Sequence, residues 1–166
     1  GAGPIGKRMA ELGLAVGMNV IGWTFHPDQE WAKCLGVTWA SLEDVLSTAD
    51  VVSIHLRLSD QSRGLVDATK LGLMKPTSIL VNTARGAIVD EDALVGSLES
   101  GRIAGAGLDV FTTEPLPPGH AFTRIDNVVL SPHVAASTPE TDYAGLEMVV
   151  DNIRNWLEGN STNVVA

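Results

Sequence analysis

The stretch Gly1-Ala2-Gly3-Pro4-Ile5-Gly6 decides the fold of this chain. Its G-x-G-x-x-G spacing is typical of the turn at which a β-strand leads into a helix in a βαβ unit. In such a turn Gly1 would make the sharp bend, Gly3 would let the backbone approach a bound pyrophosphate, and Gly6 would allow the helix to pack closely on the strand. The helix N-terminus would offer free N–H groups to that anion. The stretch therefore predicts a dinucleotide-binding fold.

An amphipathic helical pattern follows the glycines, with apolar residues at Ile5, Met9, Leu12 and Val16. The apolar segment 19–23 then has the pattern of the next strand. The strand that should precede such a turn, in the middle of the sheet, is missing before Gly1. We therefore expect a gap in the sheet between the strands at 19–23 and 51–56, and a native polypeptide that continues upstream.

Strands and helices alternate along the rest of the chain. The strands are predicted at 37–39, 51–56, 79–82, 104–110 and 128–130, and the helices at 29–35, after Ser41, at 68–74, at 90–100 and from Thr138 to Gly159. This alternation predicts an α/β fold, a doubly wound, Rossmann-like parallel sheet with helices on both faces that lacks its first central strand. The unbroken apolar run at 51–56 is typical of a strand buried on both faces. We expect residues 1–159 to form a dinucleotide-binding domain and 160–166 a tail leading back towards a substrate domain that is absent from this chain.

The chain of 166 residues is acidic, with a net charge of −9 and no cluster of basic residues. This balance argues against nucleic acid and anionic membranes as partners. Cys34 is the single cysteine, so an internal disulfide is impossible and a reducing, cytoplasmic location is expected. The spacing of the histidines, the cysteine and the carboxylates suggests no metal site.

Polar side chains follow three of the predicted strands, namely Arg85, Asp109 and His133. Because the carboxyl ends of parallel strands meet at one edge of a sheet, we expect these side chains to face one crevice opposite the glycine turn. Glu114 lies beyond Asp109 on a loop bounded by proline. A guanidinium can bind a substrate carboxylate in a planar fork, and an imidazole can exchange a proton while a carboxylate orients it. Beside a nicotinamide, such a set suffices for chemistry on a 2-oxoacid.

Other interpretations of these residues stay open. Arg85 could cap a strand or pair with an acid, and Asp109 and Glu114 could be solvated loop acids. His55 could be a core residue or a cofactor contact, whereas His120, in a loop, is expected to be structural.

Four motifs resemble those of the D-isomer-specific 2-hydroxyacid dehydrogenase family: GAGPIG at 1–6, NTARGAIVDEDAL at 82–94, AGAGLDVFTTEPLP at 104–117 and SPHVAAST at 131–138. The resemblance covers practically the whole chain, as the NAD-binding domain of that family. It implies an oxidoreductase that transfers a hydride between NAD(H) and a 2-oxoacid/(2R)-2-hydroxyacid pair, acting on the CH–OH group of its donor. It also implies a small 2-oxoacid or 2-hydroxyacid as substrate and a homodimer.

The resemblance further assigns roles to single residues. Arg85 would bind the substrate carboxylate, His133 would act as acid/base, and Glu114 would be the partner of that histidine. Asp109 would accept a hydrogen bond from the nicotinamide carboxamide. The full set of implied cofactor contacts is Gly1, Gly3, Pro4, Ile5, Gly6, Trp23, Thr24, His55, Leu56, Arg57, Thr83, Ala84, Arg85, Asp109, His133 and Ala135.

The choice of cofactor depends on the end of the strand at 19–23. Trp23-Thr24 stands where the family usually carries an acid for the adenosine ribose. NADP-binding enzymes normally place arginine or lysine here, and the segment 23–30 (WTFHPDQE) contains neither. NAD is therefore favoured, with NADP left open. The alternative functions are a formate dehydrogenase, which has glutamine where Glu114 stands, and an NAD-sensing, co-repressor-like binding protein.

Overall fold

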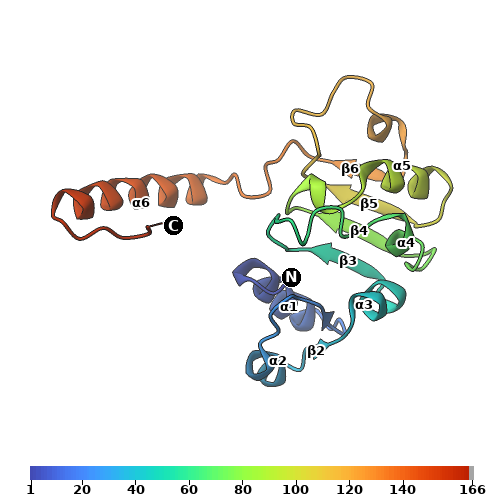
Figure 1. Cartoon of the computed structure of the whole chain (residues 1–166), viewed down its shortest axis with the longest axis horizontal. Helices are drawn as coiled ribbons and strands as arrows, with labels where there is room; N and C mark the ends of the chain where they lie inside the picture. The colour runs from blue at the N-terminus through green and yellow to red at the C-terminus, as the bar shows by residue number, and fades with distance from the viewer. Residues whose placement is uncertain (165–166) are drawn as a thin grey trace. The chain divides into compact units, whose positions relative to one another are not determined.

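A computed structural model describes residues 1–164 (Figure 1), which divide into two compact units, the second beginning at Val134. The helices of the first unit are α1 (Pro4–Ala15), α2 (Gln29–Leu35), α3 (Leu42–Thr48), α4 (Ala68–Leu71) and α5 (Glu91–Glu99), with the short 3-10 helices η1 (Gly86–Ile88) and η2 (Ala121–Arg124). Its strands are β1 (Ile21–Gly22), β2 (Thr38–Trp39), β3 (Val51–Ile54), β4 (Ile79–Asn82), β5 (Gly105–Leu108) and β6 (Val128–Leu130). The second unit contains α6 (Pro139–Leu157).

All paired strands are parallel, as the alternation of strands and helices predicts. One sheet has the order β3-β4-β5-β6, and a separate two-stranded sheet joins β1 to β2. Leu80 in β4 lies opposite Val52 in β3 and Ala106 in β5, so the strands run in register and end together. Among the described strands, β1 and β3 are not paired with each other, which is the gap expected from the sequence.

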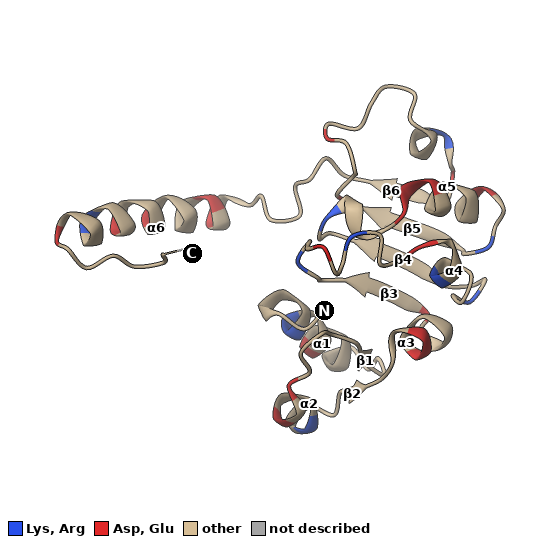
Figure 2. Cartoon of the chain, viewed as in Figure 1, with Lys and Arg blue, Asp and Glu red and all other residues tan. Residues whose placement is uncertain are grey.

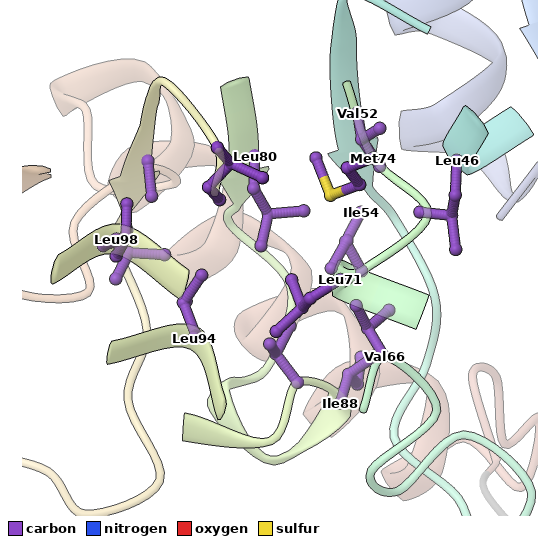
Figure 3. Packing of buried hydrophobic residues seen from close by; sticks show 14 of the residues in the cluster. Leu46, Val52, Ile54, Val66, Leu71, Met74, Leu80, Ile88, Leu94 and Leu98 are labelled. Carbon is purple, nitrogen blue, oxygen red and sulfur yellow. The ribbon is translucent and has the colours of Figure 1, made fainter. Parts of the chain in front are cut away.

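One face of the four-stranded sheet carries the core of the first unit. The helices α3, α4 and α5 supply Leu46, Leu71, Leu94 and Leu98, which pack with side chains of the sheet in a single buried cluster. Figure 3 shows these leucines together with Met74 and Leu80 at close range. Burying a leucine contributes roughly 1.5–3 kcal/mol. This cluster therefore holds the strands, and with them the strand ends, in a fixed arrangement.

The opposite face of the sheet is exposed in this structure. Val51 in β3, Ile79 in β4 and Val129 in β6 are 50%, 42% and 74% exposed. The prediction that the run 51–56 is buried on both faces is therefore wrong, because α3 to α5 cover only the side of Val52 and the strand already ends at Ile54.

The helix boundaries follow local capping signals. Asp28, Ser41, Asp67 and Asp90 precede α2, α3, α4 and α5, and each side chain accepts a hydrogen bond from a backbone N–H in the first turn of its helix. Such caps contribute about 1 kcal/mol each. They explain why these helix starts could be read from the sequence.

In the second unit, α6 begins after Thr138, whose side chain accepts from the Thr141 amide in a capping box, and it has Pro139 in its first turn. Its apolar residues Leu146, Ile153 and Leu157 are exposed. Residues 161–164 of the expected tail form no strand, and 165–166 lie outside the described residues. No helix in the described part of the chain is long and apolar enough to cross a membrane.

Candidate active site

The glycine turn lies between the ends of β1 and β3. The nitrogen of Gly1 lies 2.8 Å from the carbonyl oxygen of Trp23, and a Cβ atom on Gly1 would come within 2.6 Å of the carbonyl oxygen of His55. A Cβ on Gly6 would lie 2.1 Å from the carbonyl oxygen of Gly1. A Cβ on Gly3 would meet nothing within 4 Å. Gly1 and Gly6 are thus required by packing, whereas Gly3 faces open space, as a site for a pyrophosphate needs.

The start of α1 has the character of an anion site. Gly3 precedes the helix in an extended conformation, Pro4 is in its first turn, and that turn carries no acidic residue. The first intrahelical bond joins the Lys7 amide to the Gly3 carbonyl at 2.9 Å, so the amides of Ile5 and Gly6 come before it. Donors of this kind at the positive end of a helix favour a bound phosphate. The residues present therefore fit the pyrophosphate of a dinucleotide.

The loop after β1 is shaped by a lysine that the sequence analysis overlooked. Lys7, in α1, places its Nζ 2.6 Å from Asp28 Oδ2 and 5.1 Å from the centre of the Trp31 ring. The hydrogen bond from Lys7 lowers the pKa of Asp28. Trp23 contacts Phe25 edge to face, with ring centres 4.9 Å apart. The lysine that contacts the loop after β1 is therefore already paired with a carboxylate.

The residues after β3 lie beside the glycine turn. His55 is half-buried, and its Nε2 lies 2.9 Å from Ser53 Oγ. Burial lowers the pKa of His55, so the ring is neutral at neutral pH. Arg57 is exposed, and its carbonyl accepts a hydrogen bond from the fully buried Ser62 at 2.7 Å. That bond secures the loop which leads on to Arg63.

The turn after β4 is organised by Asn82, the last residue of the strand. Its side chain is 2% exposed, donates from Nδ2 to the Arg85 carbonyl at 3.0 Å and accepts at Oδ1 from the Ala84 amide at 3.0 Å. Arg85 Nη1 donates to the Ala84 carbonyl at 2.6 Å, while the residue as a whole is exposed. Asn82 therefore sets the path of 83–85 from which the guanidinium projects, a role that the sequence analysis did not assign to it.

The ends of β4, β5 and β6 are tied to one another at Asp109. This residue is 3% exposed, its amide donates to the Asn82 carbonyl at 3.0 Å, and its Oδ1 accepts from Ser131 Oγ at 2.5 Å. Asp109 and the segment leading to His133 are therefore held against the same strand end as Arg85.

The predicted pair of His133 and Glu114 is present. His133 Nδ1 lies 2.7 Å from Glu114 Oε2, and Glu114 Oε1 accepts from the Phe111 amide at 2.9 Å. The hydrogen bond with His133, followed by that with the Phe111 amide, lowers the pKa of Glu114. The backbone of His133 is left-handed (φ 55°), a conformation that costs about 1–3 kcal/mol and is often found at functional sites.

Arg85, Glu114 and His133 line one open cleft of about 320 Å³. Its other lining residues are Leu58, Arg63, Gly86, Ala87, Phe111 and Thr112. Figure 2 shows basic segments beside the edge of the sheet where the strands end. Arg63 is a second cation of this cleft, and nothing in its sequence context signalled it, because it lies on a loop away from any strand end.

Two further observations concern Ala135 and possible metal ligands. Ala135 belongs to the second unit, so its contact with the cofactor stays a prediction. Residues 1–164 contain no group of three or more histidine, cysteine or acidic side chains that could hold a metal ion.

Comparisons with known proteins agree with this arrangement. Residues 1–135 match the family model of the D-isomer specific 2-hydroxyacid dehydrogenase, NAD binding domain. The glyoxylate reductase of Aeropyrum pernix is 48% identical over 159 residues, which cover 96% of this chain and 48% of that protein. The chain spans about half the length of this relative.

Solved structures give the same result for the fold. The D-lactate dehydrogenase of Aquifex aeolicus, complexed with NAD and lactic acid, is 31% identical with a TM-score of 0.87, over 96% of this chain and 52% of that one. The NAD-complexed D-isomer specific 2-hydroxyacid dehydrogenase of Lactobacillus delbrueckii ssp. bulgaricus is 28% identical with a TM-score of 0.90, over 100% of this chain and 54% of that one. The predicted Rossmann-like fold is confirmed, and the chain belongs to the D-isomer-specific 2-hydroxyacid dehydrogenase family as an NAD-binding domain.

Proposed function

We propose that the protein to which this chain belongs interconverts a 2-oxoacid and a (2R)-2-hydroxyacid with NAD(H), using Arg85, Glu114 and His133. The observation that carries this proposal is the 2.7 Å contact between His133 Nδ1 and Glu114 Oε2, in a cleft that Arg85 also lines. The glyoxylate reductase and D-lactate dehydrogenase relatives support the substrate class.

His133 is the acid/base of this proposal. Its Nδ1 faces Glu114, which leaves Nε2 as the ring nitrogen that exchanges a proton with the substrate oxygen. In reduction, Nε2 donates its proton to the oxygen of the substrate carbonyl, and in oxidation it takes the proton of the hydroxyl. Glu114 keeps the ring in one tautomer and orientation, and its lowered pKa means that it remains ionised while it does so.

Arg85 binds the substrate carboxylate. A guanidinium offers two parallel N–H donors to a carboxylate, which fixes the plane of the substrate as well as its position. The backbone of Arg85 is itself held by Asn82, so the guanidinium starts from a rigid base. Arg63 adds positive charge to the same cleft and favours anionic substrates.

Bound NADH supplies the hydride. In this proposal the glycine turn would hold the pyrophosphate, Trp23 and Thr24 would contact the adenosine, and the residues after β3, β4 and β5 would contact the nicotinamide half. Residues 1–159 act as the dinucleotide-binding domain in this proposal, and a substrate domain beyond 160 stays a prediction from the sequence. A homodimer and a cytoplasmic location stay predictions from the sequence.

Turnover by the intact protein tests the proposal. Glyoxylate, hydroxypyruvate, pyruvate and branched 2-oxoacids are offered with NADH and with NADPH, and we expect reduction of at least one of them. His133→Ala should nearly abolish both directions of the reaction. Binding of NADH without turnover of any 2-oxoacid would favour the co-repressor-like alternative, and oxidation of formate would favour the formate dehydrogenase.

A further inference from the structure

We propose that Glu91 and His120 are positioning residues that hold the loop carrying Glu114, and through it set the contact with His133. This inference rests on the proposed function, because it matters for catalysis only if Glu114 does. Glu91 is the first residue of α5, and His120 precedes η2. From the sequence, His120 was expected to be structural, and no role was assigned to Glu91.

Glu91 uses both oxygens of its carboxylate on the loop after β5. Its Oε2 accepts from the Thr112 amide at 3.0 Å, and its Oε1 lies 3.2 Å from His120 Nε2. The side chains of Glu91 and His120 are only 22% and 21% exposed, so solvent screens this pair less than a surface pair.

The hydrogen bonds of His120 define its tautomer. Its Nδ1 accepts from the Phe122 amide at 3.3 Å, which places the ring proton on Nε2, towards Glu91. The imidazole also lies against the Phe122 ring, with ring centres 4.9 Å apart, and Phe122 is a member of the buried core cluster. His120 therefore connects Glu91 to the core.

The loop next to the cleft is held at adjacent residues. The Phe111 amide donates to Glu114, and the next amide, that of Thr112, donates to Glu91. Gly86 also packs against this loop, so closely that a Cβ there would lie 2.1 Å from the Phe111 carbonyl carbon. Since Gly86 directly follows Arg85, the loop that carries Glu114 packs against the turn that carries Arg85. Glu91 binds the same loop from α5.

Glu91 is not needed to begin its own helix. Asp90 already caps α5, because its Oδ1 accepts from the Ala93 amide at 3.0 Å. The carboxylate of Glu91 is instead directed to Thr112, outside the helix. Its neighbour Asp92 carries the same charge in the same helical turn and is exposed, which makes it a matched control.

A double-mutant cycle in the intact protein tests the inference, with 2-oxoacid reduction as the readout. A misplacement of a catalytic group by about 1 Å can lower the rate about 100-fold. The contact with Gly86 remains and limits the displacement of the loop, so we expect Glu91→Ala to lower kcat/KM only about fivefold. In a Glu114→Ala background the same substitution should have almost no further effect, since there is no carboxylate left to position. Glu91→Gln, which keeps an acceptor for the Thr112 amide, should recover part of the loss, and the affinity for NADH should stay unchanged throughout.

The outcomes separate this inference from the proposed function. Asp92→Ala should leave the kinetics as they are. If Glu91→Ala lowers kcat/KM equally in the native and the Glu114→Ala backgrounds, its effect is a general structural one and the positioning role is overturned. The positioning role is also overturned if Glu114→Ala lowers kcat/KM and Glu91→Ala leaves it unchanged. If Glu114→Ala itself reduces 2-oxoacids normally, the proposed function fails first and this inference with it. If Glu91→Ala does not fold, the same cycle is run with His120→Asn.

Discussion

The Glu114→Gln substitution tests the proposed pair most directly. Glutamine keeps the length of the side chain and an acceptor oxygen for the Phe111 amide, but it removes the negative charge. In the native protein Glu114 Oε2 lies 2.7 Å from His133 Nδ1, and Oε1 lies 2.9 Å from the Phe111 nitrogen. The variant therefore changes the charge beside His133 while the loop keeps its anchor.

The expected magnitude follows from that contact. A hydrogen bond to an ionised group is worth about 1.5–3 kcal/mol, roughly twice as much as a neutral one. The exposed fractions of the His133 and Glu114 side chains are 47% and 35%, so solvent reduces the difference, to about 1 kcal/mol. A loss of about 1 kcal/mol in the transition state lowers kcat/KM for 2-oxoacid reduction about fivefold.

The pH dependence has a definite sign. The hydrogen bond with His133 lowers the pKa of Glu114, so this carboxylate is ionised at neutral pH and loses its charge only as the pH falls below the ordinary value of about 4.3. In the Glu114→Gln variant that charge is absent at every pH. The difference in kcat/KM between the native protein and the variant should therefore be present at neutral pH and shrink as the pH falls towards the pKa of Glu114.

Initial rates of 2-oxoacid reduction from about pH 4 to about pH 9 measure this difference, because they span the range above and near the titration of a carboxylate. Glu99→Gln, at the exposed end of α5, is the control for loss of one acidic charge. Coincident pH profiles and equal kcat/KM for the native protein and Glu114→Gln would mean that Glu114 is a solvated loop acid, and the reasoning would be refuted.

The same pair makes a prediction for stability. A lowered folded-state pKa contributes stability that is present above the ordinary value of about 4.3 and is lost as the pH falls through the folded-state value. The native protein should therefore exceed Glu114→Gln in free energy of unfolding at neutral pH, by less than about 1 kcal/mol after solvent screening. This difference should vanish in acid, and a difference that stays constant with pH in urea titrations would contradict it.

The remaining predictions concern the cofactor and the substrate carboxylate. kcat/KM should be higher with NADH than with NADPH, and an NADPH preference of the native protein would contradict this. Asp28→Asn should reduce the ratio of the two kcat/KM values, because it frees Lys7 from its carboxylate while keeping an oxygen that caps α2. Arg85→Ala should raise the substrate KM at least about tenfold, since it removes a charge-assisted bidentate contact with the substrate carboxylate. The control Arg124→Ala, at an exposed position, should leave the KM unchanged in the same steady-state measurements. Gly6→Ala should destabilise the fold by about 1–3 kcal/mol, because its Cβ would lie 2.1 Å from a carbonyl oxygen. Gly3→Ala should leave thermal stability unchanged and weaken NADH binding, and a reversed order of the two glycine variants in calorimetry would refute their assigned roles.

Residues that directly follow parallel strands could be placed from the sequence. Arg85 and His133 come just after β4 and β6, and the parallel register brings both strand ends to one edge. Strand lengths were less predictable, because a strand extends only as far as its partner allows. The segment 19–23 was expected to be a strand, yet only Ile21 and Gly22 pair, opposite the two residues of β2.

Contacts that depend on the path of a loop or turn could not be predicted from the sequence. The pairing of Lys7 with Asp28 joins residues far apart in the chain, and the role of Asn82 depends on the path of the turn after it. No periodicity or spacing encodes such contacts, since they depend on how the sheet, the helices and the turns are arranged in space. The exposed face of β3 was missed for a related reason: an apolar run reports the character of its side chains but not which faces other elements cover.

The position of Glu114 explains why the site needs more than its strand ends. Arg85 and His133 each lie three residues beyond the end of a strand, and the buried core holds these strands in place. Glu114 lies farther out, on the loop after β5, where no strand fixes the backbone. Yet its contact with His133, at 2.7 Å, is closer than its contact with the Phe111 amide, at 2.9 Å. A loop can hold such a contact only if its own backbone is anchored, and the anchors are the Phe111 amide on Glu114, the close approach of Gly86 and the Thr112 amide on Glu91. The proposed function therefore requires both a rigid core and an anchored loop, because together they hold His133 and Glu114 at this distance.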